Sequence, residues 1–500
     1  MRPMNRNIVP LRRAAFGPNA PLLTSYPKWF TQYGAVVYLV AIAVVSLMYN
    51  AYSLPWYYLL SGVMAIVVFF LYGSSLVEQT SVLKLRRDKS FEKRIFGVAF
   101  VLRIVWMFLI YFVFMQSYGD AFGFENSDAK SYDDLGQFVA GLIRDGNYHF
   151  YDEISHYTTN NDIADMGYGV YLGFIYLLSE NSVIVVRVLK CIWSALTVVL
   201  IYRLAKRNFD SQTARVAAIF CALWPNFWYY SGCHLKETEM VFLSVLFVEQ
   251  ADQMLRSRQF TAWKVVPVLL IGATLLTLRT PLALVAFLSL LFSVVMSSER
   301  VVSWGKRVIV GILAVALIGV TMGNRIQEEA KGLFDTARGN MQTQNMEWRG
   351  KRADGNAFAK YAGKSVFAPL IFTIPFPTMV RPFDGQEVQQ LNNGGNFVKN
   401  ILSGFIIFAM FMLLISGKWR DHLMPLSFML GYLVVLTMSN FAQSERFHQP
   451  SMPFELMFAA YGLSLALTKK KYKRWFTYWS AFMFVACVAW NWFKLKGRGL

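Results

Sequence analysis

The stretch IFGVAFVLRIVWMFLIYFVFMQ, residues 95–116, is almost wholly apolar apart from Arg103, and it is soon followed by SDAKSYDDLGQFVAGLIRDGNY at 127–148. The first stretch is long enough to cross a bilayer as a helix that rises about 1.5 Å per residue. The second stretch is rich in carboxylates and has the apolar spacing of an amphipathic helix. Because the acidic residues begin only where the apolar run ends, this order places chemistry at a membrane face, and Asp128 is the main candidate for it.

Composition assigns the chain to the polytopic helical membrane proteins. Hydrophobic residues make up 55% of the chain, and apolar runs of roughly 17 to 23 residues recur from end to end. The runs are continuous and do not alternate, which excludes a β-barrel. The net charge of +19 comes from short Lys and Arg clusters between the runs, which is typical of cytoplasmic loops and not of a nucleic-acid-binding surface. Neither a disulfide framework nor a zinc site is indicated by the spacing of Cys191, Cys221, Cys233 and Cys487.

Run length and loop charge predict an all-α protein with about thirteen transmembrane helices. Alternating their sides collects the basic loops with the basic N-terminus on one side, which the positive-inside rule makes cytoplasmic. Two long external segments result, 117–181 and 323–396, and within the first we expect interfacial helices at 133–144 and 166–178. The predicted spans are 31–53, 56–76, 95–116, 182–204, 213–230, 238–255, 264–280, 282–297, 308–322, 397–416, 422–439, 451–468 and 475–493.

Three regions follow from this topology. Residues 1–94 hold a basic cytoplasmic arm and two N-terminal helices, residues 95–300 a membrane core with the first external loop, and residues 301–500 a C-terminal membrane region with the second. The first apolar run, near Phe30, is too long for a signal-peptide core and is expected to be retained. The proline-rich segment 369–383 is expected to lie against the membrane surface.

Several motifs stand in a fixed order along the chain. Asp128 and Tyr132 have the spacing of a D-x-x-x-Y pattern, and Gly146 follows later. LTLRTP at 276–281 contains an Arg-Pro step with Thr280 intervening, and ERFHQPSMPF at 445–454 contains an Arg-aromatic-x-x-Pro element. This ordered set resembles the GT-C superfamily of membrane glycosyltransferases, in particular the branch of the protein mannosyltransferases and of the enzyme that adds aminoarabinose to lipid A.

The resemblance implies a GT-C-like fold and transfer of a sugar from a polyprenyl-phosphate-linked donor. It is strong over residues 95–300, weak over 400–468 and absent from the first two helices. Many relatives carry two adjacent acids at the loop site, whereas Ala129 follows Asp128 here. That difference weakens the transfer of a metal site or of a paired-carboxylate mechanism from those relatives to this chain.

A sugar that leaves a lipid phosphate creates negative charge, so the site needs cations near the membrane surface and a base for the acceptor hydroxyl. Asp128 is the candidate base, and the alternative is that Ser127 and Asp128 only cap the helix that follows. Ionisable residues at membrane depth are costly and are therefore functional candidates. The alternative is that these ionisable residues only reach towards the lipid headgroups or, in the case of Lys236 and Glu237, form an ion pair with each other. The candidate phosphate ligands are Lys236, Arg279, Arg446 and His448.

Three further residues are supporting candidates: Asp120, which directly follows the apolar helix, Tyr132 and Glu237. No cofactor is certain from the sequence. A divalent metal is an open alternative, because oxygen ligands from Asp128, Asp120 and Glu237 suit Mg²⁺ or Mn²⁺.

We therefore expect an integral-membrane, inverting glycosyltransferase that moves a sugar or oligosaccharide from a polyprenyl-phosphate-linked donor to an acceptor on the external face. The alternative in the same architecture is a polymerase of polyprenyl-diphosphate-linked repeat units for a surface polysaccharide. A lipid-linked-glycan flippase or another transporter is less favoured, because transporters place charges near the bilayer midplane and here the charges gather at one face. A non-catalytic scaffold is a third class.

The family branch implies a bacterial inner membrane, with the N-terminus cytoplasmic and the site periplasmic. The expected partners are the lipid-linked sugar, the bilayer and a glycan, lipid or protein acceptor, and no nucleic acid. The sequence leaves open the identity of the sugar, the number of phosphates on the carrier, the acceptor class, metal dependence and oligomeric state.

Overall fold

The computed structural model of this chain is built from α-helices. It describes residues 25–48, 65–81, 87–123, 126–157, 163–257, 262–303, 393–438, 445–467 and 470–496, with a few positions between 305 and 312. Within these ranges there are seventeen α-helices, so the all-α class is confirmed for this part of the chain. The expected span 308–322, the expected external segment 323–396 and the proline-rich segment 369–383 within it lie almost entirely outside the described residues, whereas the expected span 56–76 is described from residue 65 on.

Three helices are long and apolar enough to cross a membrane. They are α4 (Asp88–Tyr118), α8 (Val183–Asn208) and the segment Val398–Ile415 of α17 (Asn393–Ile415). Together they make this a multi-pass membrane protein, while the number of thirteen spans stays a prediction. Shorter apolar helices are α12 (Ala262–Leu278), α13 (Thr280–Met296) and α20 (Met452–Ala466).

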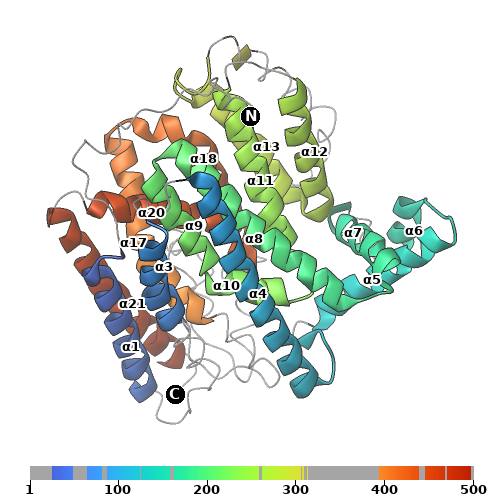
Figure 1. Cartoon of the computed structure of the whole chain (residues 1–500), viewed down its shortest axis with the longest axis horizontal. Coiled ribbons are helices and arrows are strands. Elements are labelled where there is room, and N and C mark those ends of the chain that lie inside the picture. The colour runs from blue at the N-terminus through green and yellow to red at the C-terminus, as the bar shows by residue number, and fades with distance from the viewer. Residues whose placement is uncertain are drawn as a thin grey trace.

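Helix α8 lies at the centre of the bundle, where it packs against α4, α9 (Ser211–Ala222) and α11 (Glu237–Arg256). Helix α20 packs against α9 and α17, and α18 (Leu423–Met438) packs against α13. Helices α1 (Lys28–Met48) and α21 (Lys470–Lys496) lie side by side at one edge of the bundle (Figure 1). Side chains from all of these helices join one continuous apolar core.

The segment predicted as one span at 213–230 is broken into two helices. Helix α9 ends at Ala222 and α10 spans Pro225–Gly232, with Trp224 in an extended conformation between them. Pro225 has no N–H to continue the helical ladder, and its fixed φ suits the first position of a new helix. The prediction of a continuous helix was therefore wrong here.

Arg103 of α4 satisfies the backbone groups that this break exposes. Its guanidinium donates to the carbonyl oxygens of Cys221 and Ala222, each at 3.2 Å, and to that of Ala99 at 3.0 Å. Its Nε donates to the Ser194 hydroxyl at 2.6 Å. The last carbonyls of a helix carry partial negative charge, so a buried cation is favourable at this end of α9. Arg103, the single charge in the apolar stretch 95–116, thus has a structural role.

Replacing Arg103 with Met is expected to lower the free energy of unfolding by about 2 kcal/mol, because the buried Cys221 carbonyl loses its donor from Arg103, whereas the Ala222 carbonyl keeps its hydrogen bond from Trp228 Nε1. A buried carbonyl without a donor costs roughly 1 to 3 kcal/mol. Thermal unfolding of the detergent-solubilised protein measures the effect. Val105→Met, at an exposed position of the same helix, is the control and should melt with the wild type. An Arg103→Met protein that also melts with the wild type would contradict this role.

Ion pairs gather at the end of the bundle where α4 begins and where α8 and α11 end. Lys206 of α8 pairs with Asp88 of α4, and Arg207 pairs with Glu249 at 2.6 Å and with Asp252 at 3.1 Å. Asp88, Lys206 and Arg207 belong to loops predicted to be cytoplasmic, whereas Glu249 and Asp252 lie near the end of the expected span 238–255. The structure brings all five to one end of the bundle. Which end faces the cytoplasm follows only from the positive-inside rule.

Helices α5 (Asn126–Arg144), α6 (Phe150–Tyr157) and α7 (Ile163–Ser179) form a wing beside the other end of the bundle (Figure 1). Helices α5 and α7 approach closely because their contact is made at glycines. A Cβ atom added to Gly136 would lie 2.6 Å from the Cβ of Leu172. Helix α7 also packs against α12. The segments expected at 133–144 and 166–178 are therefore helical, and their place at the membrane interface stays a prediction.

Candidate active site

Four segments that are far apart in the sequence meet next to the wing. They are the first turn of α5, the start of α11, the junction between α12 and α13, and the short helix α19 (Glu445–His448). Contacts among them join Asp128, Tyr132, Lys236, Glu237, Arg279 and Arg446, all of which were candidates from the sequence.

Arg446 joins Asp128 to Glu237. Its NH1 donates to Oδ2 of Asp128 at 2.6 Å, and its Nε donates to Oε1 of Glu237. The Asp128 side chain is 52% exposed, whereas those of Arg446 and Glu237 are 12% and 1% exposed. Glu237 thus binds Arg446 from the protein interior, and Asp128 binds it from the solvent side.

Helix starts place both carboxylates. Asp128 lies in the first turn of α5, and Glu237 is the first residue of α11. The N-terminal end of a helix favours negative charge, which makes these positions suitable for acids. The carboxylate of Asp128 bonds to the guanidinium of Arg446.

Lys236 lies at the turn before α11. Its Nζ donates to the carbonyl oxygen of Leu278 at 2.9 Å and lies 5.5 Å from the centroid of the Tyr132 ring. The first contact ties α11 to the end of α12, and the second ties it to α5. The ammonium group is therefore close to the residue that precedes Arg279.

Arg279 and Arg446 both lie near the ring of Phe447, at 4.3 Å and 5.8 Å from its centroid. Arg279 is the residue before α13 and has an extended conformation, with a proline at the start of that helix. The Phe447 carbonyl accepts a hydrogen bond from the Tyr432 hydroxyl at 2.9 Å. Cation–π contact holds guanidinium groups in place, so Phe447 brings the side chains of Arg279 and Arg446 to the same part of the site.

His448 is fully buried, and its Nδ1 lies 3.0 Å from Nζ of Lys399 in α17. Lys399 is itself fully buried and was not singled out from the sequence. The structure therefore gives His448 a contact inside the bundle, on the same short helix as Arg446.

Glu445, at the start of α19, is also buried and was missed by the sequence reasoning. It accepts hydrogen bonds from the Asn226 side chain at 3.1 Å and from Gln449 at 3.3 Å. Burial raises the pKa of Glu445 to about 7, and the charge of Lys399 opposes that rise. Because these contacts reach α10 and α17, they fix the turn that carries Arg446.

Asp120 lies apart from these contacts in a turn after α4. Its Oδ1 accepts from the backbone N–H groups of Phe122 at 2.8 Å and Gly123 at 3.0 Å. Asp120 therefore closes the turn that leads towards α5. Within the part of the chain that the structure describes, no three His, Cys, Asp or Glu side chains gather as a metal-binding group.

A buried cluster anchors the wing to the bundle. Asp133 accepts hydrogen bonds from the Tyr176 hydroxyl of α7 and from the Gln137 side chain at 2.7 Å. The same hydroxyl lies 3.2 Å from Nε2 of His234, which precedes α11. Burial raises the pKa of Asp133 and lowers that of His234 well below its usual range. Since Asp133 and Asp128 share helix α5, this cluster also positions Asp128.

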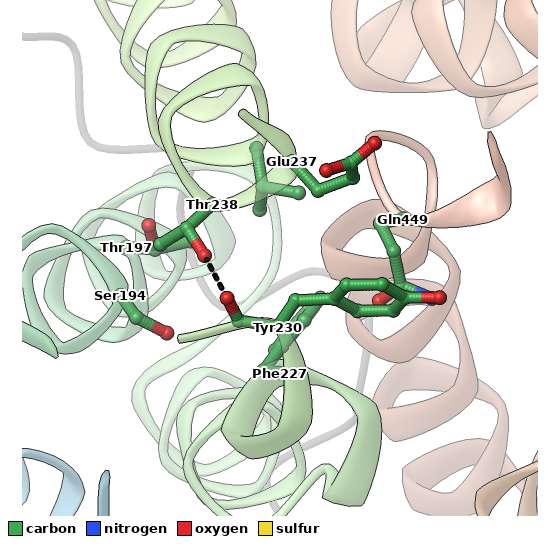
Figure 2. A pocket seen from close by; sticks show the side chains of 8 residues that line it. Ser194, Thr197, Phe227, Tyr230, Glu237, Thr238 and Gln449 are labelled. Atoms are coloured by element: carbon green, nitrogen blue, oxygen red, sulfur yellow. Dashed lines mark hydrogen bonds between the residues drawn. The ribbon is translucent and has the colours of Figure 1, made fainter. Parts of the chain in front are cut away.

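A small pocket is lined in part by Glu237, the partner of Arg446 (Figure 2). The space between its lining atoms is about 260 Å³ when open solvent is included, but it has room for only about one water molecule. Its walls come from α8, α10, α11 and the turn after α19, with Thr197, Phe227, Tyr230, Glu237, Val241 and Gln449 among its lining residues. Glu237 thus contacts both Arg446 and this pocket.

Residues 168–322 match the family described as dolichyl-phosphate-mannose-protein mannosyltransferase, which is a GT-C family. The match includes Lys236, Glu237 and Arg279, whereas Asp128 and Arg446 lie outside it. No curated protein matches the chain. Over these residues, the resemblance drawn from the sequence is confirmed at the level of a family of membrane glycosyltransferases that use a lipid-phosphate sugar donor.

Proposed function

We propose that this chain, a membrane glycosyltransferase of the GT-C superfamily, inverts the anomeric carbon of a sugar as it moves it from a polyprenyl phosphate to an acceptor hydroxyl. The observation that carries the proposal is the contact of Asp128 with Arg446, which are 318 residues apart in the sequence. A solvent-exposed carboxylate that can take the acceptor proton and a guanidinium that can bind phosphate are two groups that such a transfer requires.

In the proposed step, the acceptor oxygen attacks the anomeric carbon while the bond from that carbon to the phosphate oxygen breaks. The acceptor proton passes to Asp128, and the bonding electrons stay on the polyprenyl phosphate, which gains one negative charge. Arg446, Arg279 and Lys236 are the cations that stabilise this charge as it develops. Arg446 offers a planar fork to phosphate oxygens, whereas Lys236 acts as a point charge.

In-line attack places the base and the leaving phosphate on opposite sides of the anomeric carbon. The direct contact between Asp128 and Arg446 is therefore present only in the enzyme that has no donor bound. An exposed ion pair contributes little to stability, but breaking a buried one is expensive. The donor phosphate thus displaces Asp128 from Arg446 and leaves the buried Glu237 in place, which frees the base when the donor is bound.

The remaining candidates take positioning roles in this proposal. His448 and Glu445 hold α19 against Lys399 and Asn226, and so set the place of Arg446. Tyr132 lies against Lys236. The catalytic core is residues 95–300, extended by the C-terminal region 301–500, which supplies Arg446, while 1–94 adds the basic arm and two helices. The membrane is a bacterial inner membrane with the site on its external face, in keeping with the basic loops at the other end.

Proteoliposomes that contain the purified protein and a synthetic polyprenyl-phosphate hexose test the proposal. We expect release of polyprenyl phosphate that depends on an acceptor extract from cell envelopes. A matched polyprenyl-diphosphate oligosaccharide tests the polymerase alternative in the same assay. The proposal fails if the wild type releases no carrier from any monophosphate donor, and turnover of the diphosphate donor alone would favour the polymerase.

A further inference from the structure

The carboxyl group of Glu445 is buried, and only one of its two oxygens is hydrogen-bonded. Oε1 accepts from the side-chain amides of Asn226 and Gln449, at 3.1 Å and 3.3 Å. Oε2 is buried and has no hydrogen-bond partner among the described residues. An ionised carboxylate can only accept hydrogen bonds, so it would leave a charged oxygen unsatisfied in the protein interior. Protonation removes the charge, which is the larger part of that cost.

The charges around Glu445 also favour one bound proton. Glu455 of α20 is fully buried; its Oε1 accepts from the Ser451 hydroxyl at 2.7 Å, and its Oε2 has no partner among the described residues. The ammonium group of Lys399 favours an ionised Glu445, and the charge of Glu455 opposes it. With both glutamates ionised, this group of three residues would carry one uncompensated negative charge inside the bundle. A proton on Glu445 balances it.

The other charged or titratable groups around α19 have contacts of their own. Arg446 pairs with the two carboxylates of the site, His448 lies against Lys399, and Tyr432 of α18 donates to the carbonyl of Phe447. Ionisation of Glu445 can therefore be relieved by moving its carboxylate out to water. Since α19 is only four residues long, Arg446, the next residue, moves with it.

We infer that Glu445 is a positioning residue that works as a neutral acid: its proton keeps α19 inside the bundle with Arg446 facing the donor phosphate, and loss of this proton to water releases the turn. The inference rests on the proposed function for the role of Arg446. Burial raises the pKa of Glu445 from its ordinary value of 4.5 to about 7. The stability that the proton supplies is therefore complete below about pH 4.5 and is lost as the pH rises through about 7.

Binding of a polyprenyl methyl phosphate at pH 5.5 and pH 8.5 tests the inference. This phosphodiester has a single acidic group that is ionised at both pH values, whereas a phosphate monoester gains charge in this range. The wild type should bind it about tenfold more weakly at pH 8.5, which corresponds to the loss of one charge-assisted contact. Glu445→Gln keeps the size and an acceptor oxygen but cannot ionise, so it should bind at both pH values as the wild type does at pH 5.5.

Two further variants sharpen the comparison. Glu153→Gln makes the same exchange at a half-buried position of the wing and should show the pH dependence of the wild type. Lys399→Met removes the cation that favours the ionised form of Glu445, so the midpoint of the change in binding should move to higher pH.

Thermal unfolding without lipid measures the proton separately from the donor. The melting temperature of the wild type should fall between pH 5.5 and pH 8.5, because the folded protein binds a proton that the unfolded chain releases. Glu445→Gln should fall less and should be at least as stable as the wild type at pH 8.5. A wild type that shows both pH effects but releases no carrier from any donor refutes the proposed function and keeps the role of the proton.

Three results would overturn the inference. Equal binding of the phosphodiester by the wild type at the two pH values would show that ionisation of Glu445 does not reach Arg446. A pH dependence that persists in Glu445→Gln would assign it to another group, such as His448. A Glu445→Gln protein that melts below the wild type at both pH values would show that the fold needs the ionised carboxylate.

Discussion

An Asp128→Asn variant is expected to transfer sugar at least a hundredfold more slowly than the wild type, and to bind sugar-free polyprenyl phosphate more tightly. The loss of rate follows because a positioned general base contributes about 10² to 10⁴ to the rate. The gain in affinity follows because the amide no longer competes with phosphate for Arg446. An exposed ion pair is worth about 0.2 to 1 kcal/mol, which corresponds to a tightening of up to about fivefold.

Carrier release in proteoliposomes measures the first effect, and displacement of a fluorescent polyprenyl phosphate measures the second. Asp134→Asn is the matched control, because it removes the same charge from an exposed position of the same helix. It should change neither quantity by more than about twofold, since surface charges act weakly at physiological salt. Full activity in Asp128→Asn would exclude Asp128 as the general base, and weaker lipid binding would show that Asp128 only holds Arg446 in place.

The sequence predicted the individual parts of this site better than the contacts between them. Asp128, Glu237 and Arg446 were each recognised because a charged residue beside an apolar run is conspicuous. The contacts of Arg446 with Asp128 and Glu237 were not predicted, because they join segments that are hundreds of residues apart and no local sequence pattern indicates them. The sequence offered Lys236 as a partner for Glu237 because the two are adjacent, whereas the structure pairs Glu237 with Arg446.

The buried residues behind the site were harder to find. Lys399 lies near the start of an apolar run and reads as a residue that reaches towards the headgroups, but it is fully buried against His448. His448 and Glu445 stand in a short polar stretch that looks exposed. Their burial depends on how α10, α17 and α18 pack against α19, and side-chain type alone does not determine that.

The helices themselves were mostly predictable, because apolar length and loop charge are strong signals in membrane proteins. The break before Pro225 had a local signal that the apolar run outweighed. Arg103 was the second signal: an arginine within an apolar helix needs acceptors, and the carbonyls at the end of α9 supply them. A charged residue in one apolar helix can thus indicate that the helix packed against it is broken at that level.

An Arg446→Met variant is expected to lose sugar transfer by at least a hundredfold and also to lose stability. Removing the guanidinium takes away the cation that faces both the phosphate and Asp128, and it leaves the buried carboxylate of Glu237 without its ion-pair partner. Breaking a buried pair from one side costs about 3 to 5 kcal/mol. Carrier release and thermal unfolding in detergent measure the two effects.

The double variant Arg446→Met with Glu237→Gln separates folding from function. The amide removes the unpaired charge, so most of the lost stability should return, while transfer should stay at the level of the single variant because no cation is restored. Arg446→Lys completes the set: it keeps the charge but lacks the two N–H groups that reach Asp128 and Glu237 separately, so its donor KM should rise at least tenfold. A stable double variant that transfers sugar at the wild-type rate would exclude Arg446 from the site, and would leave Arg279 and Lys236 as the cations that meet the phosphate.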